Sequence, residues 1–459
     1  MEDRIFREYD IRGVYGDDLT EEVVDLLGRA FIRLIEKEKG LKPQRISIGM
    51  DARLSSPHLK SAMIKSILES GVDVLDIGLC PTPLQYYSLF RFPLDGGIMI
   101  TGSHNPPEFN GFKISIGRNT IYGEKIRELR NIIKNRDFIK SDRLGNVETY
   151  NIVDDYLNFI TAQFPSFEGI KVVIDSGNGA AGIVAPEIFK RLGAEILELF
   201  SEPDGNFPNH HPDPVIKENL KDLIEKVLEN KAHLGIAFDG DGDRLGVVDE
   251  TGEIIWGDRL MIIFAEDVLK NNPGAKIIGE VKCSKVMYEE IEKMGGIPIM
   301  WKTGHSLIKK KMKEEGALLA GEMSGHIFFN DRYFGYDDAI YASLRLVEIV
   351  KKAGKPYGLK KLLKEVKTMH STPEIRIECP DNKKFLVVEK FKSCFNLNEC
   401  CTIDGVRINF PHGWALLRAS NTQPALVLRF EAETEEFLED IKTLVNQRLF
   451  EVFQFFKIL

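Results

Sequence analysis

Apolar and polar positions along this chain follow a unit that occurs three times. In its first copy, the β-branched run RISIGMD (45–51) leads through a polar loop into a helix-patterned segment that ends at Gly71, and VDVLDIG follows. The same order returns from KVVIDS (171–176) and again from KIIGEV (276–281). Strand, helix and strand in short succession predict parallel sheets that are covered by helices.

Each copy also contains a third apolar run, and a glycine-rich polar loop follows it. These loops are TGSHNPPEFNGFK (101–113), DGDGDR (239–244) and GEMSGH (321–326). In parallel α/β sheets, ligands bind at the loops beyond the carboxyl ends of the strands. All three loops are therefore predicted to lie where a ligand binds.

The pattern changes near residue 369, where short apolar runs and turns predict an antiparallel sheet with helices on one face. We expect an α/β protein with three repeated α/β domains, whose sheets are mixed but mostly parallel, and a C-terminal α+β domain. The predicted domains are 1–148, 149–252, 253–368 and 369–459. No low-complexity linker separates these segments, so we expect the domains to share large interfaces.

Composition narrows the class of protein. A chain of 459 residues is too long for one core, and 43% hydrophobic with 29% charged residues is ordinary for a globular protein. The net charge of −9 argues against a nucleic-acid partner, so an anionic substrate must be met by local Arg and Lys. Six cysteines without a CxxC pair predict neither a zinc site nor a disulfide framework.

Neither a targeting segment nor a membrane span is predicted. The first residues, MEDRIFREYDIRG, are charged and lack the apolar centre of a signal peptide. No apolar run approaches the roughly 20 residues that cross a bilayer. We therefore expect a cytoplasmic protein without a membrane partner. Its oligomeric state does not follow from the pattern, because subunit interfaces and domain interfaces look alike in sequence.

The first glycine-rich loop places Ser103 in a tight turn between Gly102 and a Pro-Pro pair. The same loop contains His104 and Lys113. Gly, Asn and Pro are frequent turn residues, so a purely structural turn is one interpretation, and a functional loop is the other. The neighbouring Ser and His do not predict a catalytic triad, because adjacent side chains rarely point at each other.

The second loop contains Asp239, Asp241 and Asp243, separated by glycines. Three carboxylates at alternate positions suit a hard cation that prefers oxygen ligands. A solvated acidic turn is a poorer interpretation after the apolar strand LGIAF, because like charges repel. An EF-hand is excluded, since Arg244 occupies the position that needs glycine and the flanking segments are strand-like.

Two further segments offer polar groups for a sugar or a phosphate. In GEMSGH, Glu322, Ser324 and His326 alternate, and a carboxylate with a hydroxyl can bind sugar hydroxyls. In RASNTQP (418–424), a guanidinium, hydroxyls and backbone amides suit a phosphate monoester. Polar turns are the competing interpretation of both segments.

Another class of protein is suggested by GNGAAG (177–182), which matches G-x-G-x-x-G after a predicted strand, with Glu195 and Glu198 downstream. This pattern is found in dinucleotide-binding dehydrogenases. Nothing else in the chain indicates hydride chemistry, and a glycine-rich turn of the repeat accounts for the match equally well.

Taken together, TGSHNP, DGDGDR, GEMSGH and RASNTQP occur in an order that resembles the α-D-phosphohexomutase family, closest to its bacterial-type bifunctional phosphomannomutase/phosphoglucomutases. The resemblance covers the whole chain. It extends to YDIRG (9–13), DGNFPNHHPDP (204–214), EVKCSK (280–285) and WKTGHS (301–306). It implies four domains around a central cleft and an enzyme that moves phosphate between the 1- and 6-positions of a hexose phosphate.

The resemblance also implies cofactors, partners and site residues. A phosphoserine donates its phosphoryl group, hexose 1,6-bisphosphate is the intermediate and activator, Mg²⁺ assists, and sugar phosphates are the partners. The residues that match the catalytic group are Ser103, Arg12, Lys113, His326 and Arg244. Those that match the metal ligands are Ser103, Asp239, Asp241 and Asp243. Those that match the substrate-binding group are Tyr9, Lys282, His305, Glu322, Ser324, Arg418, Ser420, Asn421 and Thr422.

Two questions stay open within this interpretation. Lys113 and His326 both qualify as the general acid or base that serves the sugar hydroxyl. The sugar is mannose, glucose or both, because the two differ only at C2 and recognition through the other hydroxyls accepts either. Met323 stands where phosphoglucosamine mutases more often carry Gln. A phosphoglucosamine mutase and a metal-dependent sugar-phosphate phosphatase are the alternatives.

Overall fold

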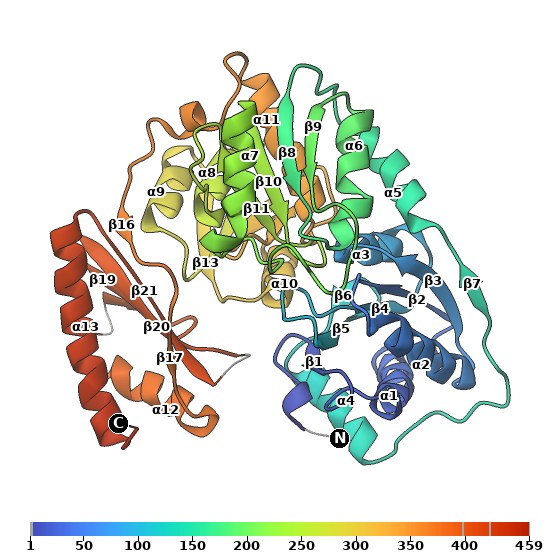
Figure 1. The fold of residues 1–459 in the computed structure, drawn as a ribbon. Coiled ribbons are helices and arrows are strands. Elements are labelled where there is room, and N and C mark those ends of the chain that lie inside the picture. Colours follow the sequence, from blue (N-terminus) through green and yellow to red (C-terminus); the bar gives the residue numbers. More distant parts are fainter. Residues whose placement is uncertain (1–2, 397–398, 422–423, 459) are drawn as a thin grey trace.

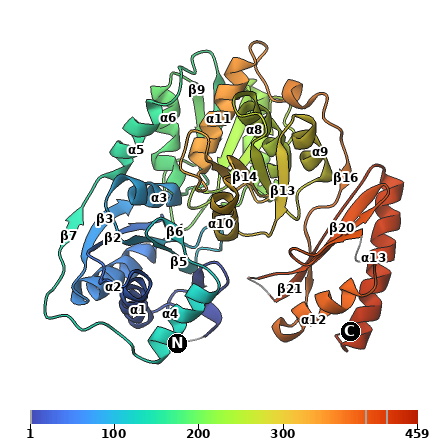
Figure 2. The same cartoon turned by 180° about the vertical axis from the view of Figure 1, so that it is seen from behind.

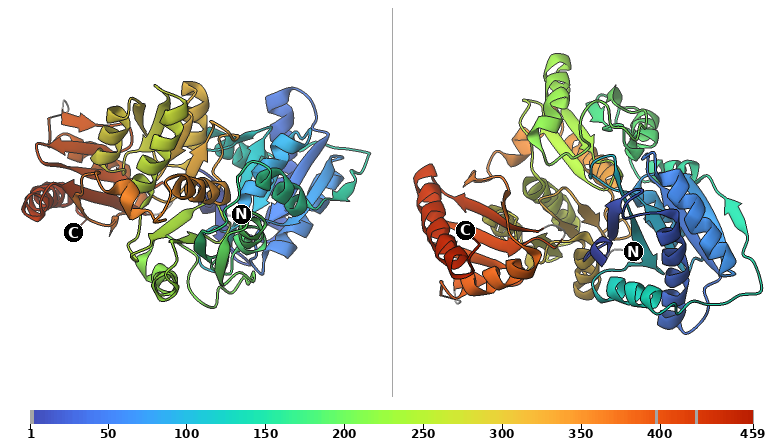
Figure 3. Two further views of the ribbon diagram at one scale, coloured as in Figure 1. Left: turned by 90° about the horizontal axis from the view of Figure 1, so that it is seen from above. Right: turned by 60° about the horizontal axis from the view of Figure 1, so that its bottom comes forward.

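The computed structural model describes residues 3–396, 399–421 and 424–458 of the chain. The described residues form four units along an arc, from an N-terminal unit through two central units to a C-terminal unit that faces the first (Figure 1). Figure 2 shows this arrangement from behind, and Figure 3 shows it from two further directions. The chain ends therefore lie in the two units at opposite ends of the arc.

The N-terminal unit contains a sheet with the order β1-β5-β4-β2-β3-β7, and β6 pairs with β5. Its strands are β1 (Ile11–Val14), β2 (Arg45–Met50), β3 (Asp73–Leu79), β4 (Gly96–Ile100), β5 (Phe109–Ile116), β6 (Asn119–Thr120) and β7 (Val147–Thr149). Its helices are α1 (Glu21–Lys39), α2 (Ser56–Glu69), α3 (Thr82–Arg91) and α4 (Glu124–Lys134). β2 pairs in parallel with β3 and β4, whereas β5 is antiparallel to β4 and β1.

The two central units repeat one smaller sheet, with the orders β11-β10-β8-β9 and β15-β14-β12-β13. The second unit comprises α5 (Ile152–Thr161), β8 (Lys171–Asp175), α6 (Ala185–Arg191), β9 (Glu195–Leu199), α7 (Lys221–Asn230), β10 (Leu234–Phe238) and β11 (Leu245–Asp249). The third comprises α8 (Gly257–Asn271), β12 (Lys276–Glu280), α9 (Lys285–Lys293), β13 (Ile297–Trp301), α10 (His305–Glu315), β14 (Leu319–Gly321), β15 (Ile327–Phe329) and α11 (Ala339–Lys352). In each sheet the strand that comes first in the chain, β8 or β12, is parallel to both of its neighbours. The strand that comes last in the chain, β11 or β15, is antiparallel to its neighbour.

The predicted repeat is visible in the strand order. When the strands of each central sheet are numbered in chain order, they lie side by side as fourth, third, first and second. In the first unit, β5-β4-β2-β3 have the same arrangement. Each glycine-rich loop joins the third strand of its unit to the antiparallel fourth strand, over residues 101–108, 239–244 and 322–326. The loops therefore follow the carboxyl ends of buried strands, where ligands of such sheets bind.

The C-terminal unit has antiparallel strands in the order β16-β21-β20-β19-β18, and β17 pairs with β21. Its elements are β16 (His370–Ser371), β17 (Ile375–Glu378), α12 (Asp381–Lys392), β18 (Cys400–Cys401), β19 (Val406–Phe410), β20 (Gly413–Ala419), β21 (Ala425–Ala432) and α13 (Glu435–Phe455). The predicted fold class, with repeated α/β units and a C-terminal α+β unit, is confirmed.

Local sequence explains where several helices begin and end. Thr20 accepts the amide of Val23 at the start of α1, and Gly40, with φ 70°, ends that helix in the left-handed conformation. Thr434 caps α13 in the same way as Thr20 caps α1. Among the described residues, no helix is long and apolar enough to cross a membrane.

A continuous apolar core joins the first three units. One cluster of buried side chains extends from Leu75 in the first unit through Ile174 in the second to Leu344 in the third. The C-terminal unit has a cluster of its own beneath α12 and α13. It meets the third unit in a small cluster that includes the fully buried Trp414 and Val281. One apolar cluster thus spans the first three units, beside a separate cluster within each of them, whereas the C-terminal unit is attached over a smaller apolar contact.

Candidate active site

Ser103 lies in the turn between β4 and β5, where the first unit meets the second. Its φ of 50° is a left-handed conformation that residues other than glycine adopt rarely and that occurs at functional sites. The residue is 2% exposed, and its Oγ donates to Asp239 Oδ2 at 3.0 Å. The Oγ also lies 3.1 Å from His104 Nδ1, so these adjacent side chains do face each other, contrary to the expectation from the sequence. The turn therefore presents a buried hydroxyl to the acidic loop of the second unit.

The loop after β2 contributes Arg53, a residue that the motifs did not indicate. Its guanidinium donates to four carbonyl oxygens at 2.5 to 2.8 Å, those of Ser103, Asn105, Pro106 and Phe109. Asp51 accepts from Arg53 at 3.2 Å and from the amide of Gly102 at 3.2 Å. The sequence feature that could have indicated Arg53 is Asp-x-Arg directly after an apolar strand, because buried charges require partners. Arg53 and Asp51 together hold the serine turn.

The loop after β10 carries three fully buried carboxylates. One carboxylate oxygen each of Asp239, Asp241 and Asp243 could serve as a metal ligand, and these oxygens lie within 4.8 Å of one another. Asp239 Oδ1 accepts the amides of Asp243 (3.0 Å) and Arg244 (3.1 Å), which closes the loop. Burial and the charge of Asp241 raise the pKa of Asp239. Among the described residues, Asp241 Oδ1 and Asp243 Oδ1 have no hydrogen-bond partner, so the loop fits a cation that binds oxygen.

Lys113 on β5 balances part of this negative charge. Its ammonium lies 2.6 Å from Asp241 Oδ2 and also contacts Asp243. Burial opposes the charge of Lys113, but these two carboxylates hold its pKa well above the ordinary value. Thr82, at the start of α3, donates to the same oxygen of Asp241 at 2.5 Å. The first unit thus supplies both a cation and a hydroxyl to the acidic loop.

Two arginines flank the serine turn and the acidic loop. Arg12 on β1 donates through Nη1 to Asn105 Oδ1 at 2.6 Å, which links the arginine to the serine turn. Arg244 donates through Nε to His326 Nε2 at 3.2 Å, and its Nε lies 4.0 Å from Asp239 Oδ2. Asn105 belongs to the loop of the first motif, although no role was predicted for it. One arginine therefore contacts the serine turn, and the other lies near the acidic loop.

The glycine-rich turn of the third unit presents a carboxylate, a hydroxyl and an imidazole. Glu322 Oε1 accepts the amide of Gly304 at 2.5 Å, and Ser324 Oγ donates to Glu322 Oε2 at 3.1 Å. His326 is 5% exposed and directly precedes β15. The segment is therefore an ordered turn, with polar side chains at the carboxyl end of β14.

Lys282 lies two residues beyond the end of β12, and His305 lies four residues beyond the end of β13. Lys282 Nζ is 3.1 Å from Glu374 Oε2 and 3.8 Å from Glu280 Oε1. The charge of Lys282 lowers the pKa of Glu374 to about 2. His305 begins α10, and its ring stacks on that of His326 with a centroid distance of 5.6 Å. Burial lowers the pKa of His305 well below its ordinary value, which favours a neutral imidazole.

Tyr9 connects three units. Its hydroxyl donates to Thr303 O at 2.8 Å in the third unit and accepts from Asn421 Nδ2 at 2.5 Å in the C-terminal unit. Arg418 is near the end of β20, and its Nη2 lies 3.0 Å from Asp404 Oδ2. The C-terminal loop therefore approaches the first and third units through its polar side chains.

The predicted site residues form two groups in space. The first surrounds the serine turn and the acidic loop and comprises Ser103, Arg12, Lys113, Asp239, Asp241, Asp243, Arg244 and His326. The second belongs mainly to the third and C-terminal units and comprises Tyr9, Lys282, His305, Glu322, Ser324, Arg418, Ser420 and Asn421. Thr422 lies outside the described residues. The stacked rings of His305 and His326 join the two groups.

The glycine-rich segment 177–182 has a different role. Gly177 and Asn178 have φ of 52° and 56°, and a single 3₁₀ turn follows over Ala180–Ile183. Asn178 Nδ2 donates to Glu202 O at 2.9 Å, and Asn209 Nδ2 donates to Asn178 Oδ1 at 2.8 Å. These contacts make the segment a structural turn that supports the loop around 202–209.

A repeated α/β scaffold with a buried serine beside an acidic loop that could hold a cation defines an enzyme suited to phosphoryl transfer. Comparison with protein families supports this class. Models described as phosphoglucomutase/phosphomannomutase alpha/beta/alpha domains I, II and III match residues 3–140, 154–252 and 256–369. The model of the C-terminal domain of the same family matches residues 374–447.

Relatives match over nearly the full length. A phosphomannomutase/phosphoglucomutase of Pseudomonas aeruginosa is 48% identical over 97% of this chain and 95% of its own length. A phosphoglucomutase of Neisseria meningitidis is 46% identical over 95% of each chain. The crystal structure of a phosphoglucomutase/phosphomannomutase family protein from Burkholderia thailandensis has a TM-score of 0.92, with 42% identity and 98% of both chains covered. The chain belongs to the phosphoglucomutase/phosphomannomutase family of α-D-phosphohexomutases, which confirms the resemblance.

Proposed function

We propose that this protein is an intramolecular phosphotransferase that interconverts hexose 6-phosphate and hexose 1-phosphate, with mannose, glucose or both as the sugar. Membership of the family, with relatives at 46% and 48% identity, supports a hexose phosphate mutase. The observation that carries the mechanism is the buried Oγ of Ser103, 3.0 Å from Asp239 in the acidic loop. A hydroxyl held against a cation site is well placed to carry and return a phosphoryl group.

Each half-reaction exchanges a phosphoryl group and a proton between two oxygens. In the first half-reaction the bond from phosphorus to Ser103 Oγ breaks, a bond to the sugar oxygen forms, the sugar hydroxyl loses its proton, and Ser103 regains one. The bound hexose 1,6-bisphosphate then turns end for end and returns its other phosphate to Ser103. The second half-reaction reverses these changes at the other end of the sugar. Lys113 and His326 are the candidate acid and base, because both lie beside Asp243 in the acidic loop.

Mg²⁺ fits the acidic loop, where Asp239, Asp241 and Asp243 would hold it together with an oxygen of phosphorylated Ser103. The buried, unpartnered carboxylate oxygens among the described residues support this assignment. When bound, Mg²⁺ supplies positive charge against the transferred phosphoryl group. Three side chains of the protein add positive charge around the same turn, namely Arg12, Lys113 and Arg244.

The second group of site residues is proposed to bind the sugar and the phosphate that does not react. For the sugar we propose Lys282, His305, Glu322 and Ser324. For the distal phosphate we propose Tyr9, Arg418, Ser420, Asn421 and, on the sequence alone, Thr422. A carboxylate accepts hydrogen bonds from sugar hydroxyls, and a guanidinium can bind phosphate through two N–H groups. Mannose and glucose differ only at C2, so contacts to the other hydroxyls would accept either sugar.

We further propose the domain limits 1–148, 149–252, 253–368 and 369–459, and a cytoplasmic protein that acts on small sugar phosphates. Each proposed domain contains one of the four sheets, apart from Thr149 at the end of β7. The net charge of −9 supports the absence of a nucleic-acid partner.

Coupled assays with the 1-phosphates of mannose, glucose and glucosamine test the proposal. We expect the 6-phosphates of mannose and glucose to form without free phosphate, and much faster than that of glucosamine. Phosphate release without isomerisation would instead identify a phosphatase. Radiolabelled hexose 1,6-bisphosphate should label the Mg²⁺-loaded protein but not Ser103→Ala, and an unlabelled wild-type protein would contradict the phosphoserine mechanism.

A further inference from the structure

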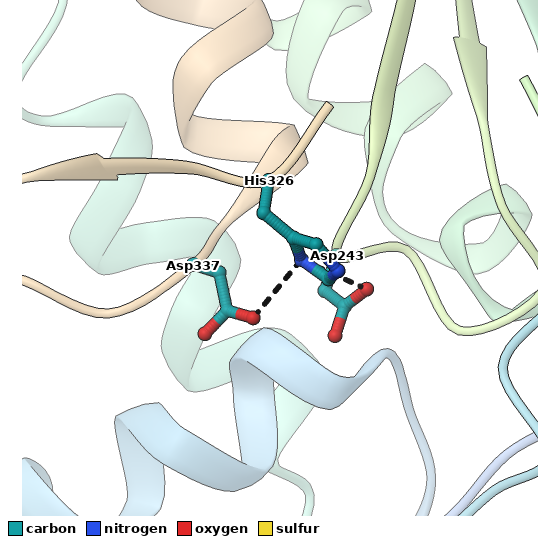
Figure 4. Close-up of side chains that lie close together, drawn as sticks. All are labelled: Asp243, His326 and Asp337. Carbon is teal, nitrogen blue, oxygen red and sulfur yellow. Dashed lines mark ion pairs between the residues drawn. The ribbon is translucent and has the colours of Figure 1, made fainter. Parts of the chain in front are cut away.

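Asp337 lies outside the predicted site residues, yet its carboxylate reaches the first group. Asp337 forms an antiparallel backbone bridge with Phe328, two residues beyond His326. The aspartate is fully buried, and its Oδ2 lies 3.1 Å from His326 Nδ1. Figure 4 shows the imidazole between Asp337 and Asp243, whose Oδ1 is 3.5 Å from the same nitrogen. Asp337 therefore supplies the nearer of the two carboxylates.

The other ring nitrogen determines where the proton of a neutral His326 lies. His326 Nε2 accepts the Nε–H of Arg244 at 3.2 Å, and a guanidinium has no lone pair with which to accept in return. A neutral imidazole carries one N–H, so Nε2 bears the lone pair and Nδ1 bears the hydrogen. This Nδ1–H is therefore on the side of Asp337 and Asp243.

The contact between His326 and Asp337 has the length of a hydrogen bond, but the N–H does not point straight at the oxygen. Asp337 Oδ2 and His326 Nδ1 are both buried without another hydrogen-bond partner among the described residues. Leaving two such groups unpaired is unfavourable, so a small rotation of the ring that pairs them is favoured. Hydrogen bonds at catalytic sites often reach good alignment only when substrate is bound.

Asp337 is held in its charged form from the opposite side. Lys309 on α10 donates to Asp337 Oδ1 at 2.9 Å, and its ammonium lies 4.0 Å from the centre of the Tyr86 ring. His305 Nδ1 lies 3.6 Å from Asp337 Oδ2. Burial opposes the charge of Asp337, but Lys309 and the two histidines hold its pKa well below the ordinary value. The carboxylate is thus an acceptor for the Nδ1–H.

The neighbouring Asp338 fixes the backbone from which Asp337 projects. Asp338 Oδ1 accepts the amide of Tyr341 at 2.8 Å and caps α11. Asp338 Oδ2 accepts from the hydroxyls of Tyr156 at 2.7 Å and Tyr333 at 2.8 Å. Asp337 therefore projects from a rigid helix start, which is the kind of support that precise positioning needs.

We infer that Asp337 is a positioning residue, which holds His326 in its Nδ1–H tautomer and leaves the Nε2 lone pair on the side of Arg244 and the transferred phosphoryl group. The inference rests on the proposed mutase reaction. In that reaction Arg244 first releases its hydrogen bond to Nε2. The sugar O–H bond then breaks, its proton bonds to the freed Nε2 lone pair, and its electron pair stays on the oxygen that attacks phosphorus. The resulting imidazolium is paired with Asp337 by a charge-assisted hydrogen bond. Asp337 is not one of the proposed metal ligands, so it remains available when a cation occupies the acidic loop.

Nitrogen-15 NMR of protein with labelled histidine tests the tautomer directly and needs no enzymatic activity. The chain contains nine histidines, and the signals of His326 are assigned by their loss in His326→Gln. At a pH where the ring is neutral, we expect a protonated Nδ1 and an unprotonated Nε2. An Nε2–H tautomer in the wild-type protein overturns the inference, whether or not the protein is a mutase.

Kinetics separate positioning from a merely structural role. Asp337→Asn keeps the shape but removes the charge, and we expect kcat to fall by about 10²-fold or more while KM changes by less than about 3-fold. Asp331→Asn is the matched control, because it neutralises a largely buried carboxylate of the same unit whose partner is Arg345, at 2.8 Å, rather than His326. It is expected to reduce kcat by less than about 10-fold.

Equal losses of kcat in Asp337→Asn and Asp331→Asn would mean that neutralising any buried carboxylate of this unit has the same effect, and would overturn the inference. A near wild-type kcat in Asp337→Asn would overturn it too. Thermal unfolding shows whether each variant folds. If Asp337→Asn does not fold, the tautomer measurement on the wild-type protein tests the inference. Failure of the proposed function would be distinct, because the unmodified protein would then show no mutase activity.

Discussion

Arg53 Nη2 donates to the carbonyl oxygen of Ser103 at 2.7 Å, and the same guanidinium binds three further carbonyls of the serine turn. The backbone of Ser103 has φ 50°, a conformation that costs on the order of 1–3 kcal/mol for a residue with a side chain. Such a conformation persists only when surrounding contacts support it. One buried arginine therefore holds the turn that presents the hydroxyl of Ser103 to Asp239.

Arg53→Lys should impair the serine turn, because an ammonium offers three donors in place of five and cannot reach four carbonyls at once. We expect phosphorylation of Ser103 to be at least about 10-fold slower and the melting temperature to fall, since buried carbonyls lose their partners. Labelling with hexose 1,6-bisphosphate and thermal unfolding measure the two effects. Arg45→Lys, in a surface pair with Glu148, is the control and should change neither. An unaltered labelling rate in Arg53→Lys would show that the turn does not depend on this side chain.

Mg²⁺ should stabilise the protein through the acidic loop, because a cation relieves the repulsion among Asp239, Asp241 and Asp243. At a concentration about 100-fold above Kd, the stabilisation is about 2.7 kcal/mol, and a chelator should abolish activity reversibly. Asp241→Asn should reduce the rise in melting temperature, whereas Asp142→Asn, at an exposed position, should not. Equal responses of both variants to Mg²⁺ would place the cation elsewhere.

Tyr9→Phe should weaken substrate binding with little effect on folding. The hydroxyl of Tyr9 bridges Thr303 and Asn421, and loss of such a hydrogen bond costs about 1 kcal/mol, equivalent to about a 5-fold rise in KM. Steady-state kinetics and thermal unfolding measure these quantities. The control is Tyr15→Phe, because Tyr15 is an exposed tyrosine. The proposed role of Tyr9 is wrong if both variants have the same KM.

Asp338 should make stability depend on pH between about 4 and 6. Burial raises the pKa of Asp338 from 3.8 to about 6, so between these values the folded state holds a proton that the unfolded chain releases. The contribution of Asp338 to the free energy of unfolding therefore decreases as pH rises from 3.8 to about 6, by at most about 3 kcal/mol. Asp338→Asn removes this titration. Urea denaturation across this range should show wild type losing stability relative to the variant, and a constant difference would contradict the prediction.

Much of the fold could be predicted, because hydrophobic periodicity and turn residues act over short distances. The repeated units were visible as apolar runs followed by glycine-rich loops. The acidic loop was equally visible, since Asp239, Asp241 and Asp243 are neighbours in the chain and their chemistry needs no partner to be recognised. Ser103 was ambiguous in isolation, because a turn with Gly and Pro does not reveal what its hydroxyl faces.

Contacts between distant segments could not be predicted in this way. Lys113 pairs with Asp241 across 128 positions, and Arg53 binds Ser103 O across 50 positions. Asp337 is closer to His326 in sequence, but only the bridge to Phe328 brings its carboxylate beside the ring. None of these partners follows from spacing or composition.

The order of the main strands and helices, the three glycine-rich loops and the residue types in each loop follow from the sequence alone, because they depend on neighbours along the chain. The contact between the loop of Ser103 and the loop of Asp239, and the support that Arg53 and Asp337 give the site from outside the motifs, are visible only in the folded chain. The physical reason is that buried charges and polar groups find partners by the packing of separate sheets, and that packing has no periodic trace in the sequence.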